Sequence, residues 1–493
     1  MIHLGNDEAY YFTYALQPDW NHFDHPPLVG IFIRIFTLNL HWVNDFSMRL
    51  AAIVSAAVCT WVIFKCGKLI KNERTGWIAA ILYNTSIYTS IISGLFILPD
   101  SPQLVFWLLA MYSMLKLILT VHTPRQGNIR LVLIGLYIGL AVMCKIHGVF
   151  LWFGFGVYVL LRDRKYLKNP FLYLSILLTL LIISPIFFWN LSNHFITWRF
   201  QGQRVEIHQA AIHIGSFVTT TLGQLFYSNP INVFIYLLAL VGLNKIDFPG
   251  KPLNLLNWLI YPIILATTVI SLFRTTLPHW SGPGFIGLML ISGYVLDEYK
   301  MHGKQKFCDL WLKISYLFII LIVIAGVLMI KFYPGTMGDR KLPERGKGDL
   351  TLDMYGWNEL QSQFEIIRQK DIKAGLMQST SPIIVAKWFP ACHYLFYVAY
   401  PMHMRIVGVG NVFDLHKFAW LNKMEGEIQK GANAYFISSS NDYKDPENIY
   451  NNDFKKITLI DKIPQRRLGK IARYWYIYRL DVALRKLGDV LPQ

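Results

Sequence analysis

The stretch Phe171–Trp189 decides the class of fold, and it reads FLYLSILLTLLIISPIFFW. None of its side chains is charged. An α-helix needs about 20 apolar residues to cross the roughly 30 Å hydrocarbon layer of a bilayer. The stretch is therefore predicted to be a transmembrane helix.

Similar apolar blocks recur along the first two thirds of the chain. They are Phe46–Phe64, Trp77–Ile97, Pro102–Leu119, Leu131–Met143, Val149–Leu161, Ile231–Leu243, Leu255–Phe273, Phe285–Leu296 and Leu312–Ile330. A mean hydropathy of +0.36 with 54% hydrophobic residues is too apolar for an ordinary soluble enzyme. The blocks Leu131–Met143 and Val149–Leu161 are short, and fit either one interrupted hairpin or two buried half-helices. We predict a polytopic α-helical membrane protein.

The net charge of +17 would suggest nucleic acid as a partner of a soluble protein. Here the basic residues fill short loops between apolar blocks, and these loops fall on one side when the blocks are counted alternately. The clearest are Lys65, Lys68, Lys71 and Arg74, then Arg162, Arg164, Lys165 and Lys168, then Lys300, Lys304 and Lys306. This placement follows the positive-inside rule, so the charge sets topology and no nucleic-acid partner is expected.

The remaining polar segments all fall on the opposite, extracytoplasmic side. They are Met1–Asp45, Ser93–Ser101, Cys144–Gly148, Asn190–Pro230, Arg274–Gly284 and the chain after Lys331. Residue 1 lies on this side without a signal peptide or a preceding span, so we expect one more helix upstream. The apolar Pro27–Leu40 is too short to span and suits an interfacial helix. Phe195–Thr221 is expected to form one or two surface helices.

The chain changes character after Ile330, which predicts two domains, 1–331 in the membrane and 332–493 outside it. Trp357–Lys373 has helical periodicity. Four segments rich in β-branched or aromatic residues read as strands. They are Pro382–Phe389, Met404–Gly408, Ala434–Ser438 and Tyr474–Arg479. We expect a small extracytoplasmic α/β domain. Five cysteines have no metal-ligand spacing and predict neither a zinc site nor a disulfide framework.

Asp7 and Glu8 are adjacent carboxylates immediately outside the predicted membrane domain, with Tyr10 and Tyr11 close behind. Such a carboxylate can act as a general base when burial tunes its pKa, and aromatic faces stack on sugar rings. The alternative is structural: Asn6 or Asp7 caps a surface helix and Glu8 lies in its first turn.

Two further acidic residues lie on the same side. Asp24 and His25 precede a double proline, and such a pair can bind a divalent cation or a phosphate. Equally, Asp24 can cap the helix that begins near Pro27. Asp100 lies in the turn Leu98–Pro102, where it is either the N-cap of the next helix or a functional carboxylate.

Cations on this side have no topological reason to be there. Lys145 with His147, Arg199 with Arg204, and His279 fall in three separate loops. Lys145 is either an anchor that extends to the interface or a phosphate ligand. A guanidinium or ammonium that neutralises a phosphate makes it a better leaving group.

Six motifs, in order, resemble the bacterial protein-mannosyltransferase-like glycosyltransferases, which are membrane enzymes of the GT-C fold related to the lipid A aminoarabinose transferase. They are Asp7–Tyr11 (DEAYY), Phe23–Leu28 (FDHPPL), Met48–Leu50 (MRL), Leu98–Pro102 (LPDSP), Cys144–Lys145 and Pro278–Trp280 (PHW). Asp353–Trp357 (DMYGW) extends the resemblance into the tail. The chain departs from the family pattern in lacking the first transmembrane helix.

The resemblance implies transfer of a sugar from a polyprenyl-phosphate carrier to an envelope lipid, glycan or protein acceptor at the outer face of the plasma membrane, with inversion. Asp7 matches the position of the catalytic base, with Glu8 beside it, and Asp100 the acidic residue of the second outer turn. Lys145 and Arg204 match basic positions that contact the carrier phosphate. Two more groups belong to this implied site: His25, which stands where lipid A enzymes tend to carry Lys, and His279. Asp24 matches an acidic position that helps bind a cation, so a divalent metal ion is a candidate cofactor.

A transporter or flippase of a lipid-linked sugar is the main alternative. Transporters usually carry paired halves and charged residues at the membrane midplane. No internal repeat is visible in the sequence, and the apolar blocks contain almost no acidic residues. A lipid-binding envelope protein without catalysis is a third reading, favoured if the carboxylates are dispensable.

Overall fold

The computed structural model describes residues 2–206 and 212–491, and its chain divides into two compact units. The helical unit comprises Trp20–Asn39 and Phe46–Ile322. The α/β unit comprises Met1–Asp19, Leu40–Asp45 and Val323–Gln493. The first residues of the chain therefore pack with its C-terminal part. The domains predicted at 1–331 and 332–493 stay a prediction.

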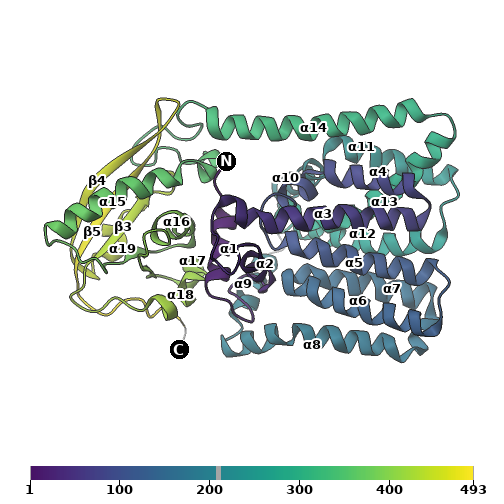
Figure 1. Cartoon of the computed structure of the whole chain (residues 1–493), viewed down its shortest axis with the longest axis horizontal. Coiled ribbons are helices and arrows are strands. Elements are labelled where there is room, and N and C mark those ends of the chain that lie inside the picture. Colours follow the sequence, from purple (N-terminus) through teal and green to yellow (C-terminus); the bar gives the residue numbers. More distant parts are fainter. Residues whose placement is uncertain (1, 207–211, 492–493) are drawn as a thin grey trace. The chain divides into compact units, whose positions relative to one another are not determined.

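The helical unit consists of α-helices that run side by side (Figure 1). They are α2 (Leu28–Phe36), α3 (Asp45–Ile70), α4 (Glu73–Thr85), α5 (Asp100–Leu119), α6 (Pro124–Cys144), α7 (Val149–Arg162), α8 (Pro170–Ser192), α9 (Ile196–Val205), α10 (Ile214–Tyr227), α11 (Pro230–Gly242), α12 (Gly250–Ile270), α13 (Gly282–Met301) and the first part of α14 (Gln305–Phe332). α5 and α6 pack together, as do α6 and α8, and α12 packs on both α7 and α13. Most of these helices begin and end within a few residues of a predicted apolar block.

In the described part of the chain, six helices are long and apolar enough to cross a membrane. They are α3, α5, α6, α8, α12 and α14. A bent pair of helices over Ile214–Lys245, with a 90° break, makes a seventh if it counts as one span. The prediction of a polytopic membrane protein is confirmed. The expectation of a short Leu131–Met143 segment is wrong, because α6 begins at Pro124 behind a Thr123 cap and reaches full length.

The predicted block Trp77–Ile97 is interrupted. α4 ends at Thr85, and a π-helical turn, η1, covers Tyr88–Ile92. Serine hydroxyl groups donate hydrogen bonds to backbone carbonyls in this segment. Ser90 Oγ donates to Ser86 O at 2.6 Å, and Ser93 Oγ donates to Tyr88 O at 3.0 Å. Such bonds compete with regular helix pairing, which explains why an apolar block breaks at this point.

Two of the predicted basic loops meet at one end of the helical bundle. Lys71 Nζ lies 2.8 Å from Glu298 and also contacts Asp297, at the C-terminal end of α13. Lys300 Nζ lies 2.6 Å from Asp309 at the start of α14. The basic residues of these two loops therefore lie at the same end of the bundle, and the side of the membrane on which they lie stays a prediction.

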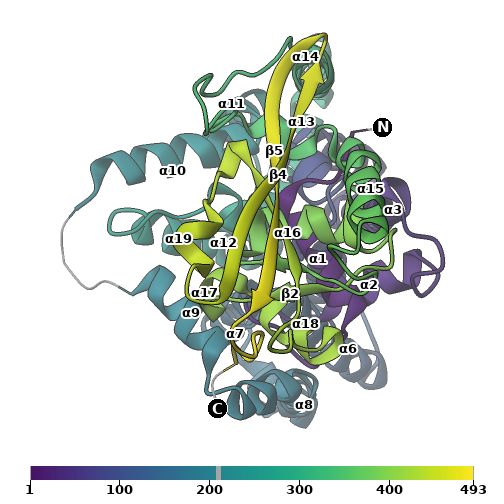
Figure 2. The same ribbon diagram turned by 90° about the vertical axis from the view of Figure 1, so that its left-hand side faces the viewer.

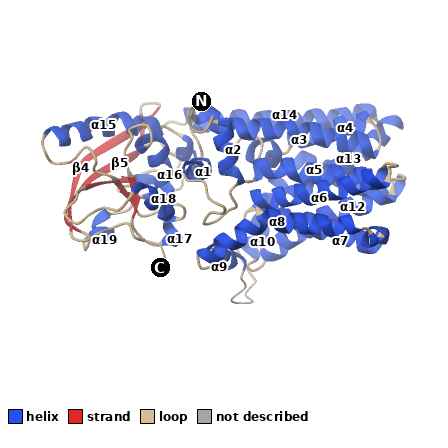
Figure 3. Cartoon of the chain, turned by 60° about the horizontal axis from the view of Figure 1, so that its bottom comes forward, coloured by secondary structure: helices blue, strands red, loops and turns tan. Residues whose placement is uncertain are grey.

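The α/β unit contains one five-stranded sheet in the order β2-β1-β3-β5-β4 (Figures 2 and 3). The strands are β1 (Ile383–Val385), β2 (Ile406–Gly408), β3 (Ala434–Ser439), β4 (Phe454–Arg467) and β5 (Lys470–Ala483). β1 pairs in parallel with β2 and β3, and the long hairpin of β4 and β5 is antiparallel. The helices are α1 (Asn6–Leu16), α15 (Trp357–Lys373), α16 (Trp388–Tyr394), α17 (Val412–Leu415), α18 (Phe418–Glu425), α19 (Pro446–Tyr450) and the last part of α14.

The predicted helix coincides with α15, and each predicted strand contains or overlaps an observed one. β4 was not predicted, because it is an edge strand with many polar residues, including Lys455, Lys456 and Lys462. Charged side chains on an edge discourage further strand pairing, but they also remove the apolar signal that identifies a strand.

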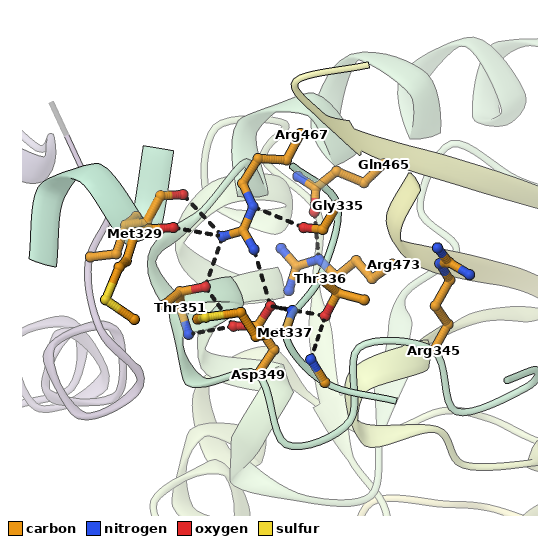
Figure 4. Close-up of polar contacts among 12 residues, drawn as sticks. Met329, Gly335, Thr336, Met337, Arg345, Asp349, Thr351, Gln465, Arg467 and Arg473 are labelled. Carbon is orange, nitrogen blue, oxygen red and sulfur yellow. Dashed lines mark hydrogen bonds and ion pairs between the residues drawn. The ribbon is translucent and has the colours of Figure 1, made fainter. Parts of the chain in front are cut away.

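A buried ion pair fixes the chain where α14 ends (Figure 4). The side chains of Arg467 and Asp349 are both fully buried and 3.1 Å apart. Arg467 also donates to Gly335 O at 2.9 Å, Thr351 Oγ1 at 2.7 Å and Ile330 O at 3.0 Å. The last carbonyls of a helix have no partner within it, so this arginine satisfies one of them and anchors the exit from α14.

Candidate active site

The centre of the candidate site is a buried ion pair between two predicted residues of the helical unit. Lys145 Nζ lies 3.0 Å from Asp100 Oδ1 and 2.9 Å from Oδ2. The residues are 3% and 2% exposed. Asp100 is the first residue of α5 and Lys145 directly follows α6. Because α5 and α6 run in opposite directions, these two ends meet.

This geometry decides two alternatives left open by the sequence. Asp100 is not an N-cap, since Pro99 occupies that place and the carboxylate binds Lys145. Lys145 is not an anchor that extends to the membrane interface, because its ammonium is buried against Asp100. A charge is costly to bury without a partner, so the pair depends on both members.

Two residues missed by the sequence analysis hold this pair. Tyr88 Oη donates to Asp100 Oδ1 at 2.9 Å. Gln103 Nε2 donates to Lys145 O at 2.7 Å and so fixes the backbone beyond α6. A Cβ on Gly282 would lie 2.4 Å from the Tyr88 ring, so only glycine allows this approach. That glycine lies two residues after Trp280 of the PHW motif, and it was the one local sequence signal for this contact.

Arg204 reaches the site from α9, which packs on the loop that carries Asp24 and His25. Gln201 Nε2 donates to Asp24 O at 2.6 Å. The rings of Phe23 and Phe200 lie 4.6 Å apart. Asp24 does not cap the following helix, because Pro27 is the N-cap of α2. The alternative of a capping role for Asp24 is therefore wrong.

The PHW motif, Pro278–Trp280, forms the third part of the candidate site, after the Asp100–Lys145 pair and α9. The Arg204 guanidinium lies 5.3 Å from the Trp280 ring centroid, in a cation–π arrangement. The His147 ring lies 5.8 Å from the same indole. His279 is the neighbour of Trp280 and lies in the short 3₁₀ turn Pro278–Ser281 that leads into α13.

The pKa values of the two predicted phosphate-binding histidines are shifted by burial and by several of the same charged side chains. Burial lowers the pKa of His25 to about 4; Asp24 and Asp100 oppose this shift, whereas Lys145 and Arg204 reinforce it. Burial likewise lowers the pKa of His279 to about 4, with Lys145 and Arg204 again reinforcing the shift. Both imidazoles are therefore neutral at pH 7, and a nearby anion would raise their pKa.

The residues around Asp24 do not fit a metal site. In residues 2–206 and 212–491, no group of three or more His, Cys, Asp or Glu side chains is placed to hold a metal ion. Hard divalent cations need several oxygen ligands, and Asp24 with His25 offers too few.

Asp7, Glu8, Tyr10 and Tyr11 belong to the α/β unit and lie on α1. Asp7 is exposed, whereas Glu8 is 1% exposed and its Oε2 accepts the Gly5 N–H at 2.8 Å. The N-cap of α1 is Gly5, so the expectation that Asn6 or Asp7 caps this helix is wrong. Glu8 takes the structural role in the first turn that the sequence left open for it.

The aromatic residues behind this carboxylate pair are packed against one another. The Tyr10 ring lies 5.5 Å from the Tyr11 ring and 5.4 Å from the Trp388 ring. Tyr10 Oη accepts the Lys417 N–H at 3.3 Å. These contacts make α1 a fixed element of the α/β unit.

Asp353, close to the start of α1, makes stability depend on pH. Burial raises its pKa from 3.8 to about 6, although Arg473 and a hydrogen bond from Asn6 oppose this. The folded state therefore binds this proton more tightly than the unfolded state, so the stabilisation is complete below pH 3.8 and is lost as the pH rises through 6. We expect Asp353→Asn to raise the unfolding temperature in detergent at pH 7.5 and leave it unchanged at pH 3.5. An equal effect at both pH values would contradict this.

The structure thus defines a class: a multi-pass membrane protein with an α/β unit and with a buried polar site at one end of its helical bundle. Comparison with known proteins agrees. Residues 24–189 match the family model described as dolichyl-phosphate-mannose-protein mannosyltransferase. The predicted resemblance to protein-mannosyltransferase-like glycosyltransferases is confirmed.

One similar protein is the lipid A galacturonosyltransferase RgtD of Rhizobium johnstonii, which is 19% identical over 295 residues. The aligned region is 59% of this chain and 60% of the length of that protein. Two crystal structures of ArnT from Cupriavidus metallidurans, one apo and one bound to undecaprenyl phosphate, match with a TM-score of 0.64. The matches are 13% and 14% identical, and each covers 97% of this chain and 94% of the other. The predicted GT-C fold is confirmed.

Proposed function

We propose that this protein is an integral-membrane glycosyltransferase. It transfers a sugar from a polyprenyl-phosphate carrier to an extracytoplasmic lipid, glycan or protein acceptor. The observation that carries the proposal is the buried Lys145–Asp100 pair, surrounded by Arg204, His25 and His279 at one end of an apolar bundle. Such a site offers cations to a phosphate beside a hydrophobic environment for a prenyl chain. The similarity to RgtD and to ArnT bound to undecaprenyl phosphate supports it.

The proposed reaction is a single displacement at the anomeric carbon. Asp7 accepts the proton of the acceptor hydroxyl, whose oxygen bonds to the anomeric carbon from the face opposite the phosphate. The bond between that carbon and the phosphate oxygen breaks, so the configuration inverts. The carrier leaves as a phosphate monoester with one more negative charge, and the proton passes from Asp7 to solvent.

Lys145 and Arg204 stabilise the charge that develops on the leaving phosphate. Fixed cations in a water-poor site are worth more than in bulk water, because their field is less screened. Asp100 holds the Lys145 ammonium in place and balances its charge before the donor binds. Tyr10 and Tyr11 follow Asp7 along α1, but both are buried and Tyr10 packs against Tyr11 and Trp388, so they support α1 and present no open face to a sugar.

The direct test uses a labelled lipid-linked sugar and the purified protein in lipid vesicles. A transferase moves the label to a second molecule, and mass spectrometry of that product names the acceptor. A transporter moves the labelled lipid between leaflets with its sugar–phosphate bond intact. That second outcome would contradict the proposal.

Donor affinity should depend on pH through the histidines. An anion close to His25 and His279 raises their pKa from about 4, so binding takes up protons. Affinity for a short-chain prenyl phosphodiester, whose own charge is constant, should rise as the pH falls from 7 to 5. Calorimetry in buffers of different ionisation enthalpy counts the protons. The double variant His25→Asn/His279→Asn should show no uptake, and unchanged uptake would remove both histidines from the phosphate site.

A further inference from the structure

The motif Asp353–Trp357 builds a tight turn in the α/β unit. A 3₁₀ turn, η6, covers Leu350–Met354, and α15 begins at Trp357. Gly356 has a φ of +70°, and a Cβ there would lie 1.6 Å from Gln465 Nε2. Only glycine fits both the backbone conformation and the space. The turn sets the Asp353 carboxylate and the Trp357 ring in fixed places.

The first residues of the chain are attached to this turn by backbone and side-chain hydrogen bonds. His3 N donates to Met354 O at 3.1 Å, and Trp357 N donates to His3 Nδ1 at 3.0 Å. Leu4 N donates to the hydroxyl of Tyr397 at 2.7 Å. The segment that leads into α1 is therefore held on two sides.

Asn6, the first residue of α1, is held at both ends of its side-chain amide. Its Nδ2 donates to Asp353 Oδ2 at 2.9 Å. Its Oδ1 lies 2.8 Å from His393 Nε2, which donates to it. The His393 ring is fully buried and stacks on Trp357 with 4.2 Å between centroids and 4° between planes. Burial lowers the pKa of His393 well below its usual value, so the imidazole is neutral and carries its proton on Nε2.

We infer that Asp353 and His393 are positioning residues that fix Asn6 and thereby aim the adjacent Asp7 carboxylate. The inference rests on the proposed function, because Asp7 is the base only in that reaction. Asp7 is exposed and follows Asn6 directly, so a rotation of the first turn of α1 would move its carboxylate. Two hydrogen bonds to one amide prevent such a rotation.

Four variants separate the hydrogen bonds from the packing. Asp353→Ala removes the acceptor for Asn6 Nδ2, whereas Asp353→Asn keeps an oxygen there. His393→Phe keeps the ring against Trp357 and removes the donor, whereas His393→Gln keeps an N–H near the Nε2 position. We expect the variants that lose a hydrogen bond to lower kcat about tenfold with an unchanged donor KM, since misplacing a reacting group weakens the chemical step. The two conservative variants should stay near wild type.

Hydrogen exchange provides a readout that needs no activity. Backbone amides in the first two turns of α1 should exchange about tenfold faster in Asp353→Ala and His393→Phe than in their conservative partners, since a local opening becomes easier. Equal exchange and equal kcat in all four variants would overturn the inference. If the exchange changes but Asp7→Asn keeps full activity, Asp353 and His393 do fix Asn6, and the proposed function fails. If Asp7→Asn is inactive but all four variants have the same kcat and the same amide exchange, only the positioning role of Asp353 and His393 is wrong.

Discussion

Asp7→Asn is expected to lower sugar transfer about a thousandfold, because an amide cannot accept the proton of the acceptor hydroxyl. The side chain is exposed and its shape is preserved, so neither folding nor the cationic phosphate site should change. Initial rates of transfer and the binding of a prenyl phosphodiester are the measurements. Donor affinity should stay within about twofold of wild type, since the phosphate contacts assigned to Lys145 and Arg204 remain in place.

Asp414→Asn is a matched control for this variant. Asp414 is also an exposed aspartate of the α/β unit, and it lies on α17. The control should transfer sugar at the wild-type rate. Full activity in Asp7→Asn would remove Asp7 from the mechanism.

Lys145→Met is expected to abolish donor binding and also to destabilise the protein. It leaves Asp100 buried without its cation, which typically costs about 3–5 kcal/mol. Thermal unfolding in detergent and binding of a prenyl phosphodiester report the two effects. Lys313→Met, at an exposed lysine of α14, should change neither.

The double variant Lys145→Met/Asp100→Asn separates stability from function. Without a charge on either partner, the desolvation cost disappears, so most of the unfolding temperature should return. Donor binding should not return, because the Lys145 ammonium that is proposed to bind the donor phosphate is still absent. Recovery of both would show that Lys145 is only structural.

Apolar patterning predicted the membrane fold well because burial in lipid acts on each helix separately. The block Phe171–Trp189 became α8 with three more residues after it and one before. The sequence-based predictions failed where polar side chains form hydrogen bonds or ion pairs, either with nearby backbone or with residues far along the chain. Neither the hydroxyl groups that interrupt Trp77–Ile97 nor the many polar residues of β4 give an apolar signal.

The same limit explains the errors within the candidate site. Proximity to a helix start suggested capping roles for Asp24 and Asp100, but the partner of Asp100 lies 45 residues further along the chain. Tyr88 and Gln103 looked like ordinary residues of apolar segments. Lys145 and Arg204 stood out as cations on an unexpected side, and they do lie with His25 and His279 in the helical unit.

Phosphorus NMR during sugar transfer tests the central claim most directly. The substrate is a labelled polyprenyl-phosphate sugar, and the protein is the wild type in lipid vesicles with acceptor present. We expect one phosphate diester to become one monoester for each sugar that reaches the acceptor. If the diester signal persists while the labelled lipid changes leaflet, the protein moves the carrier without breaking its bond to the sugar.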